Sequence, residues 1–306
     1  MLRASLSISA VCIKEFRYIS FVSIILIRKM TEINTDTFYE AILKLTKEAG
    51  KLITDNINNR NKLTEVKASD IDLVTETDKA VEKLLMDGLS KQFKDHKFIG
   101  EETVSAGGNL HLTDAPTWII DPIDGTLNFI HSFPHSCVSV ALFIEKKPEI
   151  GIIYNPMMNQ LFTARRGKGA FLNGNQIHVS NKKALNEALI MLEGGTSRDT
   201  EKMKTVYQNQ QKLMPKVQGL RALGSAALNM AMVALGAADA YFEFGIHIWD
   251  IAAGELIIKE AGGVVIDPSG DDLKRFSRRV LAASSPELAE KLSKELVQFY
   301  PTPDDS

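Results

Sequence analysis

Apolar residues recur at helical spacing in two segments near the start of the chain. Residues 38–57 and 75–93 both show this spacing, which predicts two amphipathic helices. The second segment begins with Thr75-Glu76-Thr77-Asp78, a capping-box pattern that places Asp78 in the first turn, where the helix dipole favours negative charge. In the first segment the apolar positions are Ile42, Leu45, Ala49, Leu52 and Ile53.

Short apolar runs typical of strands follow, and the second half of the chain alternates such runs with helical segments. Alternation of this kind predicts an α/β sheet covered by helices. The run Arg166-Gly167-Lys168-Gly169 joins two strand-like segments and opens no helix, so it predicts a hairpin turn and not a phosphate loop. Strands are predicted at 138–144, 150–154, 161–164, 170–172, 188–192, 240–244 and 264–267, and helices from about Thr200, over 225–235 and from Ile251.

Composition narrows the class of protein. The chain has 306 residues and a formal charge of −2, without a concentrated basic surface, so nucleic acid is not an expected partner. Its two cysteines, Cys12 and Cys137, cannot form a disulfide framework. Cys137 lies in an apolar run, which predicts a buried, reduced thiol and a cytoplasmic protein.

Residues 1–29 differ from the remainder. Residues 18–27 are almost wholly apolar but too short to span a bilayer, which needs about 20 apolar residues, and no secretory cleavage site follows convincingly. Two interpretations stay open, namely an extension absent from the functional protein and a weak organelle signal. Met30 is an alternative start, so we predict one catalytic domain over residues 30–306, not bound to a membrane.

Candidate chemistry begins where the apolar run Trp118-Ile119-Ile120 meets Asp121-Pro122-Ile123-Asp124-Gly125-Thr126. Pro122 cannot donate to a sheet ladder and Gly125 tolerates unusual backbone angles, so we expect the chain to leave the sheet here. Crowded carboxylates suit a hard cation such as Mg²⁺, and the Ile123 carbonyl is a further oxygen ligand. Taken alone, the run fits a strand-ending Asp-Pro turn equally well.

Two more acidic clusters follow strand-like segments. Glu101 and Glu102 come directly after residues 98–100, and Asp250 follows residues 246–249 near a predicted helix start. The structural alternatives are a solvated loop for the glutamates and an N-cap for Asp250. Because such junctions converge at the ligand-binding edge of open α/β sheets, we expect the three clusters to meet in space.

Together these segments carry a family resemblance. Gly100-Glu101-Glu102, the run from Asp121 to Thr126, and Trp249-Asp250-Ile251-Ala252-Ala253-Gly254 resemble, in order and spacing, three signatures of the inositol monophosphatases, which are Mg²⁺-dependent and lithium-sensitive. Residues 72–78, 165–171 and 260–263 are also similar to the family, and the resemblance runs from Met30 nearly to the end. It implies a layered α-β-α-β-α sandwich of the sugar-phosphatase type (α+β or α/β class), a homodimer, and a site where its two halves join.

The resemblance also implies roles for single residues. Glu101, Asp121 and the Ile123 carbonyl resemble ligands of a first Mg²⁺, and Asp121, Asp124 and Asp250 those of a second, with a third ion near Glu101. Two metal ions can hold both the attacking and the leaving oxygen of an in-line displacement. Thr126 and Asp78 match the family's pair that helps to polarise the attacking water, and Lys67 matches a basic residue near that water.

For the substrate, the amides of Gly125 and Thr126 are suited to phosphate oxygens. The resemblance assigns inositol hydroxyls to Glu243 and Asp124, a backbone contact to Ala226, and a place beside the substrate to Asp250. Without the resemblance, Asp78 is a helix cap, and Lys67 and Glu243 are solvated surface. Leu127 departs from many animal members, which carry threonine, but removes no expected ligand.

The implied activity is hydrolysis of myo-inositol monophosphates to myo-inositol and phosphate by direct attack of metal-activated water, without a phosphoenzyme. This reaction belongs to inositol phosphate metabolism and phosphatidylinositol signalling. The alternatives are a phosphatase of another sugar phosphate or of 3′-phosphoadenosine nucleotides, and a non-catalytic scaffold. A scaffold would be expected to have lost an acid, whereas all four side-chain ligands are present.

Overall fold

The computed structural model describes residues 35–58, 64–67 and 73–305. The predicted extension at 1–29, Cys12 and the beginning of the 72–78 motif lie outside the described residues. Residues 1–40 and 41–306 form separate compact units, and of the first the structure describes only the start of helix α2 (Thr35–Ile57). Everything that follows concerns residues 41–306.

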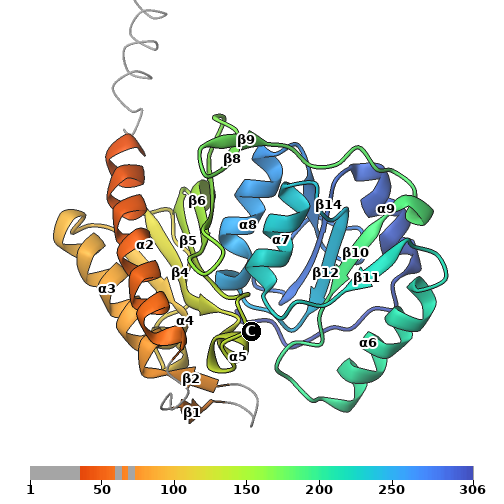
Figure 1. Ribbon diagram of the computed structural model, residues 1–306, viewed down its shortest axis with the longest axis horizontal. Coiled ribbons are helices and arrows are strands. Elements are labelled where there is room, and N and C mark those ends of the chain that lie inside the picture. The colour runs from red at the N-terminus through yellow and green to blue at the C-terminus, as the bar shows by residue number, and fades with distance from the viewer. Residues whose placement is uncertain (1–34, 59–63, 68–72, 306) are drawn as a thin grey trace, which may run out of the picture. The chain divides into compact units, whose positions relative to one another are not determined.

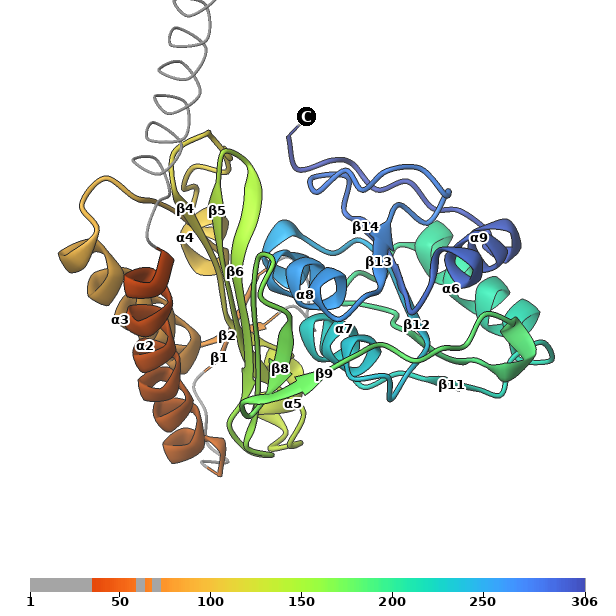
Figure 2. The ribbon, with the colours of Figure 1, turned by 90° about the horizontal axis from the view of Figure 1, so that it is seen from above.

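Five layers make up this unit (Figures 1 and 2). Helices α2 and α3 (Glu76–Gln92) cover the outer face of a seven-stranded sheet. Helices α7 (Ala226–Ala234) and α8 (Ile248–Glu260) separate it from a five-stranded sheet, whose outer face is covered by α6 (Thr200–Leu213) and α9 (Pro286–Glu295). The expected α-β-α-β-α sandwich is confirmed. None of the described helices is long and apolar enough to cross a membrane.

The larger sheet has the strand order β3-β4-β5-β6-β7-β8-β9, and only its β3–β4 pair is parallel. Strands β4 and β5 are buried at every position, because helices cover both faces, and this explains the apolar runs at residues 118–120 of β4 and 140–144 of β5. The hairpin predicted at 166–169 is confirmed between β7 and β8. The strands are β3 (Lys97–Gly100), β4 (Thr117–Asp124), β5 (Cys137–Ile144), β6 (Lys147–Asn155), β7 (Gln160–Arg165), β8 (Ala170–Leu172) and β9 (Asn175–Ile177).

The smaller sheet has the order β11-β10-β12-β14-β13. Strand β10 pairs in parallel with β11 and β12, and β14 is antiparallel to both of its neighbours. Strand β14 and helix α9 were not predicted. The strands are β10 (Leu189–Leu192), β11 (Gly219–Arg221), β12 (Ala240–Phe244), β13 (Val264–Ile266) and β14 (Arg279–Ala283); a small pair, β1 (Thr64–Val66) and β2 (Leu73–Thr75), and short helices α4 (Glu101–Ser105), α5 (Thr126–Ile130) and η1 (Leu185–Glu187) complete the fold.

The central helices are buried on nearly all sides, as expected of helices enclosed between two sheets. Alanine-rich α7 lies against α8 at Gly254, where an added Cβ would come within 2.6 Å of Met230 Sδ. Gly254, the last residue of the third signature, is therefore required by helix packing. Cys137 is a buried free thiol, as predicted.

Two expected boundaries were wrong. Strand β4 does not stop before Asp121 but continues to Asp124 through a register shift, and a bulge of this kind accommodates Pro122 without a ladder hydrogen bond. Helix α8 begins at Ile248 and not at Ile251, because Asp250 accepts a hydrogen bond from the His247 amide (2.5 Å) in a capping box. Asp250 is therefore the third residue of the helix, and its N-cap interpretation was wrong.

Candidate active site

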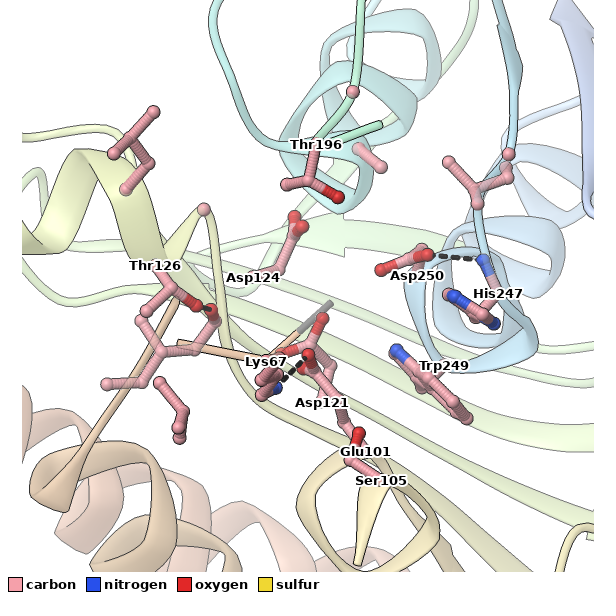
Figure 3. Close-up of a pocket in the computed structure, with 18 of the residues that line it drawn as sticks. Lys67, Glu101, Ser105, Asp121, Asp124, Thr126, Thr196, His247, Trp249 and Asp250 are labelled. Carbon is pink, nitrogen blue, oxygen red and sulfur yellow. Dashed lines mark hydrogen bonds and ion pairs between the residues drawn. The ribbon is translucent and has the colours of Figure 1, made fainter. Parts of the chain in front are cut away.

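The three acidic junctions meet at one cavity of about 1120 Å³ (Figure 3). Parallel neighbours β3 and β4 bring Glu101 and Asp121 to the same edge of the larger sheet, and the first turn of α8 brings Asp250 to them. Carboxylate oxygens of Asp121, Asp124 and Asp250 all lie within 4.8 Å of one another. The expected convergence in space is confirmed.

The two carboxylates of the β4 bulge are held differently. Asp124 Oδ2 accepts hydrogen bonds from Ser225 Oγ (2.5 Å) and from the Ala227 amide (2.7 Å) at the start of α7. Asp121 is 1% exposed, and its Oδ1 has no hydrogen-bond partner among the described residues. A buried carboxylate oxygen without a donor is costly unless a cation binds it.

The raised pKa values of the three aspartates also favour a cation site. Burial and the charge of Glu101 raise the pKa of Asp121, burial and Asp124 raise that of Asp250, and burial raises the pKa of Asp124 to about 6. Each shift means that the charged cluster is unfavourable in isolation. All of the atoms that could bind a metal ion here are oxygens. This fits a hard divalent cation, whose usual protein ligands are carboxylates of this kind.

Lys67 lies beside Glu101 and Glu102, which begin helix α4. Its Nζ donates to Glu101 Oε1 (2.7 Å) and to Glu102 Oε1 (2.8 Å), and the three side chains are mostly buried. Burial, with the nearby charge of Glu101, raises the pKa of Glu102 to about 8. The solvated alternatives for Lys67 and for the two glutamates were therefore wrong.

Asp78 serves two hydrogen-bonding functions through its two carboxylate oxygens. Its Oδ2 accepts from the amide and the hydroxyl of Thr75, which completes the predicted capping box of α3. Its Oδ1 lies 3.2 Å from Thr126 Oγ1, which is also 2.9 Å from the Ile123 carbonyl. Burial raises the pKa of Asp78 to about 6. The capping interpretation and the expected contact with Thr126 both hold.

Gly125 makes the turn between β4 and α5. It has a φ of +85°, and an added Cβ would lie 3.0 Å from the carbonyl oxygens of Gly224 and His135. Both the backbone angle and the space therefore require glycine. This conformation puts the amides of Gly125 and Thr126 at the start of α5, where both residues line the cavity.

The smaller sheet and α7 also contribute to the cavity wall. Glu243 of β12 is 4% exposed, and its Oε2 accepts a hydrogen bond from the Tyr241 hydroxyl (2.5 Å). Burial, with the nearby charge of Glu193, raises the pKa of Glu243 to about 8. Ala226 begins α7 and lines the cavity. Glu243 is thus a buried acid, and its surface interpretation was wrong.

Sequence reasoning missed other cavity residues. Glu193 follows strand β10, and its Oε1 accepts hydrogen bonds from the amides of Leu223 and Gly224. An acid directly after an apolar run was the signal used for the other three junctions, and it could have found Glu193. Asp304 also lines the cavity and contacts His247 Nδ1 (3.0 Å). No local pattern places this residue of the C-terminal segment.

Comparisons with known proteins agree with this geometry. The model of the inositol monophosphatase family matches residues 34–299. Inositol monophosphatase 1 of Bos taurus is 45% identical over 258 residues, which cover 84% of this chain and 92% of that protein. Inositol monophosphatase 3 of Solanum lycopersicum is 47% identical over 254 residues, covering 82% and 94% of the two chains.

Among solved structures, the extragenic suppressor protein suhB of Bartonella henselae is similar, with a TM-score of 0.78 and 30% identity, and the match covers 86% of this chain and 99% of that one. The match to the family model extends from the first described helix to the C-terminal segment, and it includes all of the acidic junctions. With its fold, its carboxylate cluster and these relatives in agreement, this chain belongs to the inositol monophosphatase family.

Proposed function

We propose that this protein is a Mg²⁺-dependent phosphatase that hydrolyses myo-inositol monophosphates to myo-inositol and phosphate. The observation that carries the proposal is the convergence of Asp121, Asp124 and Asp250 within 4.8 Å, beside the Thr126–Asp78 pair. The names of the bovine and tomato relatives support the choice of substrate.

Two to three Mg²⁺ ions would bind here. Glu101, Asp121 and the Ile123 carbonyl would hold the first and Asp121, Asp124 and Asp250 the second, with a third near Glu101. Because Oδ2 of Asp124 is already bound to Ser225 and Ala227, its Oδ1 is the oxygen left for a metal ion. When bound, these ions supply positive charge that neutralises the phosphate and lowers the pKa of water.

The chain's own residues orient the reactants. The Ile123 carbonyl, the other acceptor within reach of the Thr126 hydroxyl, would bind the first ion, so Asp78 accepts the hydrogen of that hydroxyl. The hydroxyl oxygen is then left to accept a hydrogen bond from the attacking water. The amides of Gly125 and Thr126 donate to phosphate oxygens. The water oxygen then bonds to phosphorus while the bond to the inositol oxygen breaks, and the proton lost by the water is balanced by one taken up by the leaving inositol oxygen. Lys67 keeps Glu101 and Glu102 in place.

Glu243 and Ala226 recognise the alcohol part of the substrate. A buried carboxylate accepts hydrogen bonds from ring hydroxyls, and these bonds are stronger than those of a neutral acceptor. Glu243, Asp124 and Thr126 line the same cavity, and Asp124 is fixed there by its hydrogen bond from the Ala227 amide of α7.

The test is phosphate release with Mg²⁺ from inositol 1-phosphate, 2′-AMP, fructose 1,6-bisphosphate and 3′-phosphoadenosine 5′-phosphate. We expect the highest kcat/KM for inositol 1-phosphate. Asp121→Asn should abolish turnover, whereas Asp87→Asn, on the exposed face of α3, should not. A preference for the adenosine bisphosphate would replace the proposed substrate, and an active Asp121→Asn enzyme would refute the proposed metal site.

The proposal includes a cytoplasmic homodimer. The buried, unpaired Cys137 thiol suits a reducing compartment. Light scattering after size-exclusion chromatography tests the dimer, and a monomer at micromolar concentration would refute it.

A further inference from the structure

Lys202 is buried beside the candidate substrate cavity. It is the third residue of α6, where its amide donates to the Asp199 side chain (2.8 Å) of the N-cap. The residue is 2% exposed, and a lysine is almost never buried to this degree unless a negative charge accompanies it. The position of the ammonium group therefore needs an explanation.

Two glycines of the cavity wall make room for this ammonium group. A Cβ added at Gly195 would lie 2.7 Å from Lys202 Nζ and 3.0 Å from Glu243 Oε1, and one added at Gly245 would lie 2.9 Å from the same Nζ. Both glycines line the cavity and have positive φ angles, 63° and 87°. The Lys202 ammonium and the Glu243 carboxylate thus both lie next to Gly195, in space that the side chain of any other residue at this position would occupy.

The charges around Glu243 come from four elements. Burial and Glu193, which follows β10, raise the pKa of Glu243, and Asp124 of β4 acts in the same direction. The Tyr241 hydroxyl on β12 and the Lys202 ammonium on α6 oppose this shift. Lys202 is the cation that favours the charged form of Glu243.

The effect is mutual. Burial lowers the pKa of Lys202, as do the positive charges of Arg278 and Arg198, whereas Glu243 and the N-cap Asp199 oppose that shift. Each of the two buried groups therefore stabilises the charged form of the other. Removal of either charge at this depth is unfavourable, because it leaves the other uncompensated.

We propose that Lys202 is a positioning residue for substrate recognition, which favours the charged, hydrogen-bond-accepting form of Glu243 and so selects phosphate esters of polyols over simple phosphate monoesters. Lys202 acts through Glu243 and does not touch the substrate, since Gly195 and Gly245 lie between. A neutral glutamic acid would present one donor and weaker acceptors to the ring hydroxyls. This inference rests on the proposed function, in which Glu243 binds those hydroxyls.

The kinetic test compares Lys202→Met with the wild type on inositol 1-phosphate and on p-nitrophenyl phosphate, which has no alcohol hydroxyl to reach Glu243. We expect KM for inositol 1-phosphate to rise at least about 10-fold with kcat nearly unchanged, because a uniform binding contact is weakened. KM for p-nitrophenyl phosphate should stay within about twofold. Lys204→Met, an exposed lysine of the same helix, is the matched control and should behave as wild type.

A double-mutant cycle with Glu243→Gln separates this role from a general packing role. In the Glu243→Gln background, Lys202→Met should cause no further rise in KM, and its effect on the urea midpoint should shrink. Lys202→Gln replaces Lys202→Met if the latter does not fold. An equal rise in KM for both substrates, additive effects in the cycle, or an unchanged KM would overturn the role of Lys202.

Failure of the proposed function looks different. A wild-type protein that does not hydrolyse inositol 1-phosphate would refute the proposed function, and the polyol role of Lys202 with it. An active wild type without coupling between Lys202 and Glu243 would refute the inference alone.

Discussion

In the absence of divalent cations, the free energy of unfolding of this protein should fall as the pH rises from about 5 to about 8. Burial raises the pKa of Asp124 from 3.8 to about 6, and burial with the charge of Glu101 raises that of Glu102 from 4.5 to about 8. Between its unfolded and folded pKa, such a carboxyl group binds more protons in the folded chain. The free energy of unfolding therefore falls as pH rises through this range.

Asp124 sets the scale of the effect. Its pKa shift of roughly two units corresponds to about 3 kcal/mol at pH 7, since one unit is worth about 1.4 kcal/mol. That loss is a large part of the roughly 5–15 kcal/mol that stabilises a typical domain. Cations bound by the charged carboxylates should reverse it, by about 2.7 kcal/mol at a Mg²⁺ concentration of 100 times Kd.

Urea unfolding followed by tryptophan fluorescence, between pH 5 and pH 8, measures this effect with EDTA and with Mg²⁺. Asp121→Asn removes one charge from the cluster, so it should be more stable than wild type in EDTA at pH 8 and gain less from Mg²⁺. Asp87→Asn, an exposed carboxylate near Lys83, is the control and should keep the wild-type pH dependence. The reasoning fails if stability in EDTA is constant or rises with pH, or if Asp121→Asn is the less stable protein.

Three other substitutions test separate parts of the structure. Thr126→Val removes the hydroxyl beside Asp78 and should lower kcat by at least about 100-fold in a phosphate-release assay, whereas Thr126→Ser should stay active; comparable kcat values would contradict this role. Gly125→Ala, at φ +85°, should cost about 1–2 kcal/mol in urea unfolding, and an unchanged midpoint would argue against strain. Arg279→Leu leaves buried Asp267 without its ion pair (2.5 Å) and should cost about 3–5 kcal/mol while KM is unchanged, so a specific rise in KM would be unexpected.

The helices and apolar strands could be predicted because burial of one face or of both leaves a periodic or unbroken apolar pattern. The start of α8 could not be predicted, since residues 246–249 are apolar except for His247, and both a strand and a first helical turn fit them. Strand β14 begins at Arg279, a residue that is buried because Asp267 pairs with it. Such a pairing between distant segments leaves no trace in local periodicity.

At the site, the acids could be located because each follows an apolar run directly. The depth of their burial could not, because it depends on the second sheet and on α7 closing over them. Glu243 and Lys67 illustrate this limit, as polar residues in isolation are expected at the surface. The burial of Lys202 could not be predicted for the same reason.

The bulge in β4 determines which face of the sheet the side chains of Asp121 and Asp124 point to. Side chains alternate across a strand, so residues three positions apart point to opposite faces of a regular sheet. Here Asp121 is paired with Ser139 and Asp124 with Cys137, two positions that share a face. One additional residue thus reverses the parity of the strand and brings both carboxylates to the same side, while the Ile123 carbonyl turns to the Thr126 hydroxyl. The irregularity at Pro122 is therefore the step that converts a buried structural strand into a ligand-binding edge.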